Sequence, residues 1–127
     1  MSKILSVIET AYRATLEEQD DPIVWITHAL KGAGADINVL LRGNAVNYAV
    51  KGQDASGLSF GAKKQTQPPR LDHDVSQLIG KGVEVYIVED DVGERGLERT
   101  DLIDGLKTVS RGGIAALVSS HDQIWHW

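Results

Sequence analysis

Cysteine is missing from the sequence altogether. Disulfide bonds, thiolate metal sites, iron–sulfur clusters and thiol nucleophiles all need cysteine sulfur, so this chain supplies none of them. The absence gives no information about the redox compartment, because a chain without thiols is indifferent to it. It does exclude every reaction in which this chain would provide a sulfur nucleophile.

Basic clusters and long apolar runs are missing as well. The formal net charge is −5 and the lysines and arginines are scattered, which leaves no basic surface for a phosphate backbone. No apolar run approaches the roughly 20 residues that span a bilayer. The first residues, "MSKILSVIE", turn acidic too early for a signal peptide. We therefore expect no nucleic-acid partner, no membrane partner and a cytoplasmic location.

The residues that are present predict one folded domain over 1–127. With 42% hydrophobic and 24% charged residues, the chain has an ordinary globular composition. A chain of this length buries roughly two-thirds of its unfolded surface in one core. Five segments are expected to be strands, at 3–8, 36–43, 83–88, 107–110 and 123–127, of which 107–110 is either a short strand or an extended connection. Helical segments alternate with them, which predicts an α/β fold with a parallel sheet covered on both faces.

The expected helices differ in how clearly their ends are marked. The clearest start is Asp21 followed by Pro22, because an Asp before the helix accepts the free amides and a Pro in the first turn loses no hydrogen bond. The apolar stripe of that helix consists of Ile23, Ile26, Thr27 and Leu30. Further helices are expected at 44–51, 71–82, 100–106 and 113–122, the third of these capped by Thr100 or Asp101. The segment 10–20 is expected to be a loop or a loose helical turn.

One long segment breaks every periodicity. Residues 52–70, "GQDASGLSFGAKKQTQPPR", show neither helical nor strand spacing. A loop of this length is uncommon inside a compact domain unless it is functional or disordered. We interpret it, and 54–70 in particular, as a long loop or an arm used in oligomer formation.

Acidic residues gather where three expected strands end. Glu9 follows the first strand, Arg42 and Gly43 end the second, and Glu89, Asp90 and Asp91 follow the third. Ligands of open parallel sheets bind at this edge, and Mg²⁺ is typically held by one or two carboxylates and water. A phosphate-accepting receiver is disfavoured, since only one acid follows the first strand and Lys107 precedes its hydroxyls. A run of charges is more often a solvated turn, so the cluster is either a metal or catalytic site or a surface turn.

The remaining motifs carry weak signals. The glycines of "GAGADINVLLRG" follow a helix and precede a strand, which is the reverse of the order that dinucleotide binding needs. The "RGG" at 111–113 is either an anion site at exposed amides or, more commonly, a plain turn. The histidines at 28, 73, 121 and 126 are not at zinc spacing, and His28 is expected on the polar side of its helix. The consecutive residues 119–122 cannot face one another as a hydrolase triad. We expect no metal and no cofactor.

Two tryptophans end the sequence in "IWHW". The alternation of side chains along a strand places Trp125 and Trp127 on one face, with Ile124 and His126 on the other. The tryptophans either cap the core or contribute to a subunit interface, where Trp is enriched.

Several motifs in order resemble one known family. They are "INVLLRGNAVNYAVKGQ" at 37–53, "LIGKGVEVYIVEDDVGERGL" at 78–97, "DLIDGLKTVS" at 101–110 and the terminal "HDQIWHW". Together they resemble the DsrE/DsrF-like family over nearly the whole chain except 54–70. The resemblance implies a single three-layer α/β/α domain with a mostly parallel five-stranded sheet. It also implies trimers or hexamers, either of one chain or mixed with related subunits.

Active members of that family resemble sulfur carriers. A cysteine at or just beyond the third strand accepts a persulfide and passes it to a small partner protein. Here the matching stretch runs from Val88 to Asp91, upstream of Arg95, and it contains no cysteine. A persulfide needs a thiolate that can attack and leave, which a carboxylate cannot replace.

Two hypotheses follow. The first is a non-catalytic DsrE/DsrF-like oligomer subunit or binding module, with no persulfide chemistry of its own and a cleft for a small ligand or partner protein. The residues of that cleft are Glu9, Tyr12, Gly43, Asn44, Glu89, Asp90, Asp91 and Arg95. The second is a metal-assisted hydrolase or phosphoryl-transfer enzyme that uses the same acids.

Overall fold

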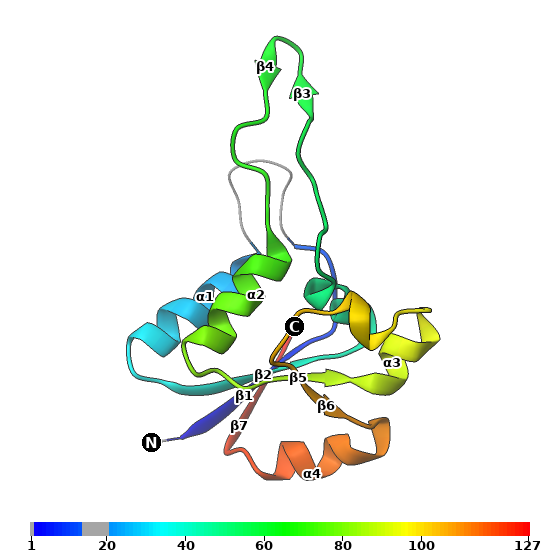
Figure 1. Ribbon diagram of the computed structural model, residues 1–127. Coiled ribbons are helices and arrows are strands. Elements are labelled where there is room, and N and C mark those ends of the chain that lie inside the picture. The colour runs from blue at the N-terminus through cyan, green and yellow to red at the C-terminus, as the bar shows by residue number, and fades with distance from the viewer. Residues whose placement is uncertain (1, 14–20) are drawn as a thin grey trace.

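Five parallel strands form the central sheet (Figure 1). The computed structural model describes residues 2–13 and 21–127, so most of the segment 10–20 lies outside the described residues. The strands are β1 (Lys3–Ile8), β2 (Asp36–Leu41), β5 (Val85–Val88), β6 (Lys107–Val109) and β7 (Gln123–His126), in the order β6-β5-β2-β1-β7. Every neighbouring pair is parallel, which confirms the predicted parallel sheet.

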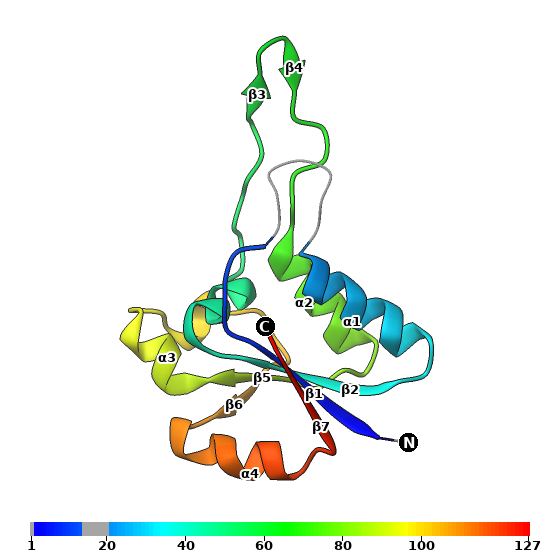
Figure 2. The same ribbon diagram turned by 180° about the vertical axis from the view of Figure 1, so that it is seen from behind.

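Helices cover both faces of the sheet, but unequally (Figures 1 and 2). Helices α1 (Pro22–Gly32) and α2 (Leu71–Gly80) lie on one face, and the shorter α4 (Ile114–Ser119) lies on the other. The layers are therefore helix, sheet and helix, as expected. Shorter helical turns connect these elements, namely η1 (Gly43–Ala49), α3 (Glu89–Glu94), η2 (Arg99–Asp101) and η3 (Arg111–Gly113).

Alternating side chains divide the core in two. Ile8 and Val39 belong to the larger core beneath α1 and α2. Leu5, Val7 and Leu40 belong to the smaller core against α4. The near-continuous apolar runs of β1 and β2 are therefore buried on both faces, which is the arrangement that such runs predict.

Helix α1 begins where the sequence predicted. The Oδ1 atom of Asp21 accepts hydrogen bonds from the N–H groups of Ile23 and Val24 at 2.9 and 3.0 Å, and Pro22 occupies the first turn. The Oδ2 atom of Asp21 accepts a hydrogen bond of 2.6 Å from the hydroxyl of the buried Tyr48. This second bond ties the start of α1 to η1.

Two side chains of α1 lie differently from the prediction. Ile26 is 38% exposed, because Val24 rather than Ile26 completes the buried stripe with Ile23 and Thr27. His28 does not point to solvent: it is half-buried, with its Nε2 atom 2.9 Å from the backbone oxygen of Asp74 in α2. The side of α1 that carries His28, which was expected to be polar, packs against α2.

The helix expected at 100–106 is a single 3₁₀ turn, η2. Its cap is Glu98 rather than Thr100: the Glu98 N–H donates to Asp101 Oδ2 at 2.8 Å, and the Glu98 side chain accepts from the Asp101 N–H. The turn ends because Leu102 adopts an extended backbone and pairs with Val50. The helix expected at 44–51 is likewise a 3₁₀ helix, η1, which ends before Val50.

Residues 52–70, called the arm from here on, stand away from the sheet and its helices (Figures 1 and 2). The outer part of the arm is a hairpin of β3 (Ser59–Phe60) and β4 (Lys63–Lys64), paired antiparallel. Phe60 is 50% exposed there. The expected long loop thus contains a short hairpin, while its use in oligomer formation stays a prediction.

The root of the arm is fastened to the segment that follows η2. The Lys51 N–H donates to the backbone oxygen of Asp101, and the Ile103 N–H donates to that of Ala49, each at 2.9 Å. These two bonds flank the antiparallel bridge formed by Val50.

The tryptophans of β7 lie on the α1 side of the sheet, since Trp125 is in register with Ser6. Trp125 is half-buried, and Trp127 is more exposed, with its Nε1 donating to Ser6 Oγ at 3.1 Å. Ile124 points to the opposite face and is 41% exposed.

Among the described residues no helix has the length and apolar character needed to cross a bilayer.

Candidate functional site

The carboxyl ends of the strands meet along one edge of the sheet, because all five strands are parallel. Glu9 follows β1, Arg42 and Gly43 follow β2, Glu89 begins α3 after β5, and η3 follows β6. We call this the strand-end edge. The fold therefore brings most of the predicted acidic cluster to one place.

Asp91 is the centre of a hydrogen-bond network at this edge. One carboxylate oxygen accepts a hydrogen bond of 2.8 Å from the Gly43 N–H, and the other accepts one of 2.6 Å from Arg111 Nη2. The residue is only 7% exposed. Burial by itself would raise the pKa of Asp91, but the Gly43 amide and the Arg111 guanidinium favour the charged form and lower it below its usual range.

Arg95 and Asn44 reinforce the same junction. Arg95 Nε and Nη2 donate to Asn44 Oδ1 at 3.2 and 2.9 Å, and Arg95 Nη1 donates to the backbone oxygen of Asp91 at 3.1 Å. The bonds join α3 to η1, two segments that are far apart in the sequence. Both residues were predicted for the site, and their hydrogen bonds hold α3 and η1 together.

Arg111 also contacts two further acidic residues, Asp90 and Glu94. Its backbone N–H donates to Asp90 Oδ1 at 2.8 Å, and its Nη2 also lies 3.0 Å from Glu94 Oε1. The hydrogen bonds that the Arg111 guanidinium donates to Asp91 and Glu94 raise its pKa. The "RGG" turn thus does bind an anion at an exposed amide, but the anion is the protein's own Asp90.

The three acids differ in burial: Asp91 is buried, whereas Glu89 and Asp90 are exposed, as a solvated run of charges predicts. They form the first turn of helix α3, where negative charge is favourable, and two of them accept hydrogen bonds from Gly43 or Arg111. Within residues 2–13 and 21–127, no three acidic or histidine side chains are grouped as metal ligands. The hydrogen bonds of these acids hold the segments after β2 and β6 against α3.

Gly43 is fixed in its position by geometry. Its φ angle of +56° lies in the left-handed region, which favours glycine, and a Cβ atom there would lie 3.3 Å from Glu9 Cγ. The close approach lets the Gly43 N–H reach Asp91. It also places Glu9 beside the network.

Glu9 has two neighbours of its own, Arg42 and His126. Its carboxylate lies 3.5 Å from Arg42 Nε and 3.0 Å from His126 Nε2. Arg42 Nε is buried and, among the described residues, has no hydrogen-bond acceptor. The contact with His126 ties the end of β1 to β7.

Tyr12 lies apart from the other predicted residues. Its ring stacks on that of Tyr48 at 5.5 Å between centroids, and its hydroxyl donates to Gln53 Oε1 at 3.0 Å, next to the root of the arm. Partial burial raises the pKa of Tyr12. A hydrogen bond to Asp21, added to burial, raises the pKa of Tyr48 further, so both rings are neutral hydrogen-bonding groups at physiological pH.

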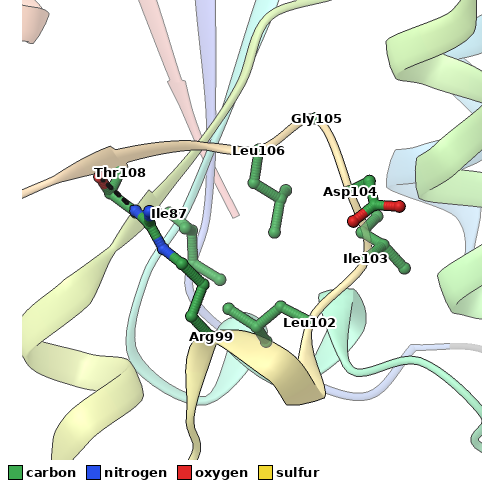
Figure 3. Close-up of a pocket in the computed structure, with 8 residues that line it drawn as sticks. All are labelled: Ile87, Arg99, Leu102, Ile103, Asp104, Gly105, Leu106 and Thr108. Carbon is green, nitrogen blue, oxygen red and sulfur yellow. Dashed lines mark hydrogen bonds between the residues drawn. The ribbon is translucent and has the colours of Figure 1, made fainter.

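Two adjoining pockets open on the other side of α3. One, of about 190 Å³, lies between β5, β6 and the segment 102–106 (Figure 3). The second, of about 230 Å³, extends toward α3 and includes Glu89. Ile87, Arg99, Leu102 and Thr108 line both of them.

The structure divides the eight predicted residues into four groups. Gly43, Asn44, Asp90, Asp91 and Arg95 form the network, Glu9 borders it, Glu89 lines a pocket, and Tyr12 stacks near the arm. Sequence reasoning missed Arg111, His126 and Arg99, whose partners lie in distant segments. A signal for Arg111 was available, because its turn had been recognised as able to bind an anion.

Comparison with known proteins shows the fold. No protein-family model matches the sequence, and no curated protein sequence matches it. The YchN protein from E. coli superposes with a TM-score of 0.76 at 20% identity, covering 100% of both chains. MTH1491 from Methanobacterium thermoautotrophicum, a protein of unknown function, superposes with a TM-score of 0.63 at 16% identity, covering 98% of this chain and 99% of the other.

Coverage of both chains nearly from end to end means that the fold is shared over the whole domain. At these identities the similarity concerns the backbone. The roles of Asp91, Arg95 and Arg111 follow from the contacts described above.

Proposed function

We propose that the protein is a non-catalytic DsrE/DsrF-like subunit or binding module, with no persulfide chemistry of its own. The observation that carries this proposal is the combination of a complete three-layer domain with the absence of cysteine. The motif order supports the family, and so does the end-to-end match to YchN. We propose that it acts through its surface and its assembly.

The position after β5 supports the non-catalytic part of the proposal. The family resemblance places a cysteine at or just beyond this strand, whereas here the chain continues into Glu89, Asp90 and Asp91. Both oxygens of Asp91 accept hydrogen bonds from within the protein. A carboxylate held in this way stabilises the loop after β2 and offers no atom that can accept sulfane sulfur.

Exposed apolar side chains support an assembled state. Trp25 on α1 is 60% exposed, Phe60 on the arm 50% and Ile124 on β7 41%. Large apolar side chains of this kind are enriched at protein interfaces. We propose a homo-oligomer, a trimer or hexamer, or a mixed assembly with related subunits, located in the cytoplasm and able to contact a small partner protein.

The metal-assisted enzyme gains no support from the geometry. Asp91 has a donor at each oxygen, and Asp90 accepts from Arg111. A cation bound to Asp91 would lie next to the Arg111 guanidinium and be repelled by its charge. We therefore propose no reaction for this edge.

Sulfur transfer is tested by incubating the purified protein with a persulfide donor and measuring its intact mass. The native chain is expected to gain no sulfur. The matched control is Glu89→Cys, which places a thiol at the exposed start of α3 and is expected to gain sulfur under the same conditions. Sulfane sulfur bound to the native chain would contradict the proposal.

The assembly is tested separately by light scattering coupled to size-exclusion chromatography. A stable oligomer is expected at micromolar concentration. A strictly monomeric protein would contradict the oligomeric part and leave the result of the sulfur experiment intact.

A further inference from the structure

The two adjoining pockets lie where helices cover the sheet least. On the α1 and α2 side, β6 is an edge strand, and the segment 99–106 passes over it (Figures 1 and 3). Ile87 and Thr108 are paired in register across β5 and β6, and both line the two pockets. The floor of this site is therefore fixed by the sheet itself.

Arg99 separates the two pockets and borders both. Its side chain extends from η2 toward β6, and its Nη2 donates to Thr108 Oγ1 at 3.3 Å (Figure 3). Among the described residues Arg99 has no acidic partner within ion-pair distance, unlike Arg111 on the same edge. Four of its five N–H donors are thus free to bind an anion.

The second pocket is largely apolar, whereas polar and apolar atoms contribute about equally to the surface of the first. Leu102 and Leu106 contribute apolar surface to the first pocket, and Val92 and Leu97 contribute it to the second. Ile87 beneath them has no exposed surface. A cavity with an apolar floor and one well-placed charge is typical of sites for small organic ligands.

One acid stands in each pocket: Asp104 in the first and Glu89 in the second. Both are exposed, and neither is an ion-pair partner of Arg99. They are acceptors for an ammonium or hydroxyl group on a ligand whose anion is bound by Arg99.

We infer that these pockets bind a small organic acid that has a short apolar chain. The carboxylate pairs with the Arg99 guanidinium, whose planar donors match a carboxylate in a two-bonded arrangement. The apolar chain lies against Leu97 or Leu106, the partly exposed leucines of the two pockets. This inference goes beyond the proposed function and does not depend on it, since neither assembly nor sulfur chemistry enters it.

The test is a nuclear magnetic resonance titration of the full-length protein with hexanoate at millimolar concentrations, because a ligand this small binds weakly. Saturable shifts are expected at the amides of Ile87, Leu102 and Thr108. Hexan-1-ol, which has the same chain without the charge, is expected to bind at least about tenfold more weakly. Equal binding of the alcohol, or no saturable shift with hexanoate, would overturn the inference.

Arg99→Gln is expected to weaken hexanoate binding at least about tenfold, since it removes the charge and keeps a polar, though shorter, side chain. The matched control is Arg70→Gln, an exposed arginine before α2 that lines neither pocket. The control is expected to bind hexanoate like the native protein. Unchanged binding by Arg99→Gln, or an equal loss in both variants, would count against Arg99 as the anchor.

Norleucine has the same carbon chain as hexanoate and an added α-ammonium group, so it separates two kinds of natural ligand. Tighter binding of norleucine identifies an amino acid, and the loss of that advantage in Asp104→Asn or Glu89→Gln shows which pocket holds the ammonium. Tighter binding of hexanoate identifies a simple carboxylic acid. If neither compound shifts the Ile87 amide, the site is not a carboxylate site.

Discussion

Two arginines lie beside strand β6 and have different partners. Arg111, just after the strand, contacts Asp91 at 2.6 Å and Glu94 at 3.0 Å. Arg99, just before it, contacts only the hydroxyl of Thr108 among the described residues. The first charge is used to hold the loops of the strand-end edge together, and the second is left for a ligand. Charge at the ends of parallel strands therefore does not by itself indicate a binding site, because its partners decide its use.

The largest expected effect concerns the buried partner of Arg111. Asp91→Ala removes the acceptor of the Gly43 amide and of the guanidinium, and leaves the amide unpaired. We expect the free energy of unfolding to fall by about 2–3 kcal/mol, measured by urea denaturation. Glu94→Ala breaks only an exposed pair and is expected to cost less than about 0.5 kcal/mol. Equal losses in the two variants would show that Asp91 is not the centre of the network.

The charge of Asp91 also predicts a pH dependence. Because the pKa of Asp91 is lower in the folded state than in the unfolded state, its contribution to stability is present above the unfolded value and is lost as the pH falls through the folded one. The stability difference between the native protein and Asp91→Asn is therefore expected to be constant above about pH 5 and to shrink below about pH 4. Chemical denaturation across this range measures it. A difference that does not change with pH would mean that the carboxylate charge contributes nothing.

Gly43→Ala tests the backbone of the hydrogen-bond network that contains Arg111. The left-handed conformation and the contact with Glu9 Cγ are expected to cost about 1–2 kcal/mol of unfolding free energy. Gly52→Ala is the matched control, since Gly52 also has positive φ, at +79°, with open space around it. A larger loss at Gly43 than at Gly52 in thermal unfolding isolates the close approach to Glu9. Equal losses at the two positions would indicate that backbone conformation alone sets the cost, and a larger loss at Gly52 would contradict the prediction.

The smallest effect is expected on the Arg99 side. Arg99→Gln is expected to change the free energy of unfolding by less than about 0.5 kcal/mol, because the side chain is exposed and makes one long hydrogen bond. Arg111→Gln, measured in parallel, is expected to be the more destabilising change, because it removes the charged donor of the buried Asp91. If Arg99→Gln proved the more destabilising, its charge would belong to the fold and the contrast between the two arginines would be wrong.

The sheet and its helices were predictable because their signals are local. The apolar runs of β1 and β2 show burial on both faces, and Asp21 followed by Pro22 marks a helix start within two residues. The order of strands and helices then limits the fold to a parallel sheet. The exposed Ile26 shows the limit of this reasoning, because residue spacing alone does not show which residues at the border of an apolar stripe are buried.

The network at the strand-end edge was predictable only in location. The position of Asp91 after a buried strand placed it at the correct edge, but its partners Gly43 and Arg111 come from segments far away in the sequence. A run of three acids on its own predicts a solvated turn. Distant donors convert it into a helix start with one buried carboxylate.

Arg99 gave no signal in the sequence. Its importance comes from the shortness of β6 and from the passage of the segment 99–106 over Ile87 and Thr108. These are tertiary relations between segments. No spacing of residue types near position 99 expresses them.

The pairing of Val50 with Leu102 has a mechanical consequence. The segment leading into the arm and the wall of the first pocket are joined by the two hydrogen bonds of Lys51 and Ile103. A force that swings the hairpin about its base is transmitted to Leu102, or else these bonds break. A partner that binds the hairpin therefore also acts on the shape of the first pocket.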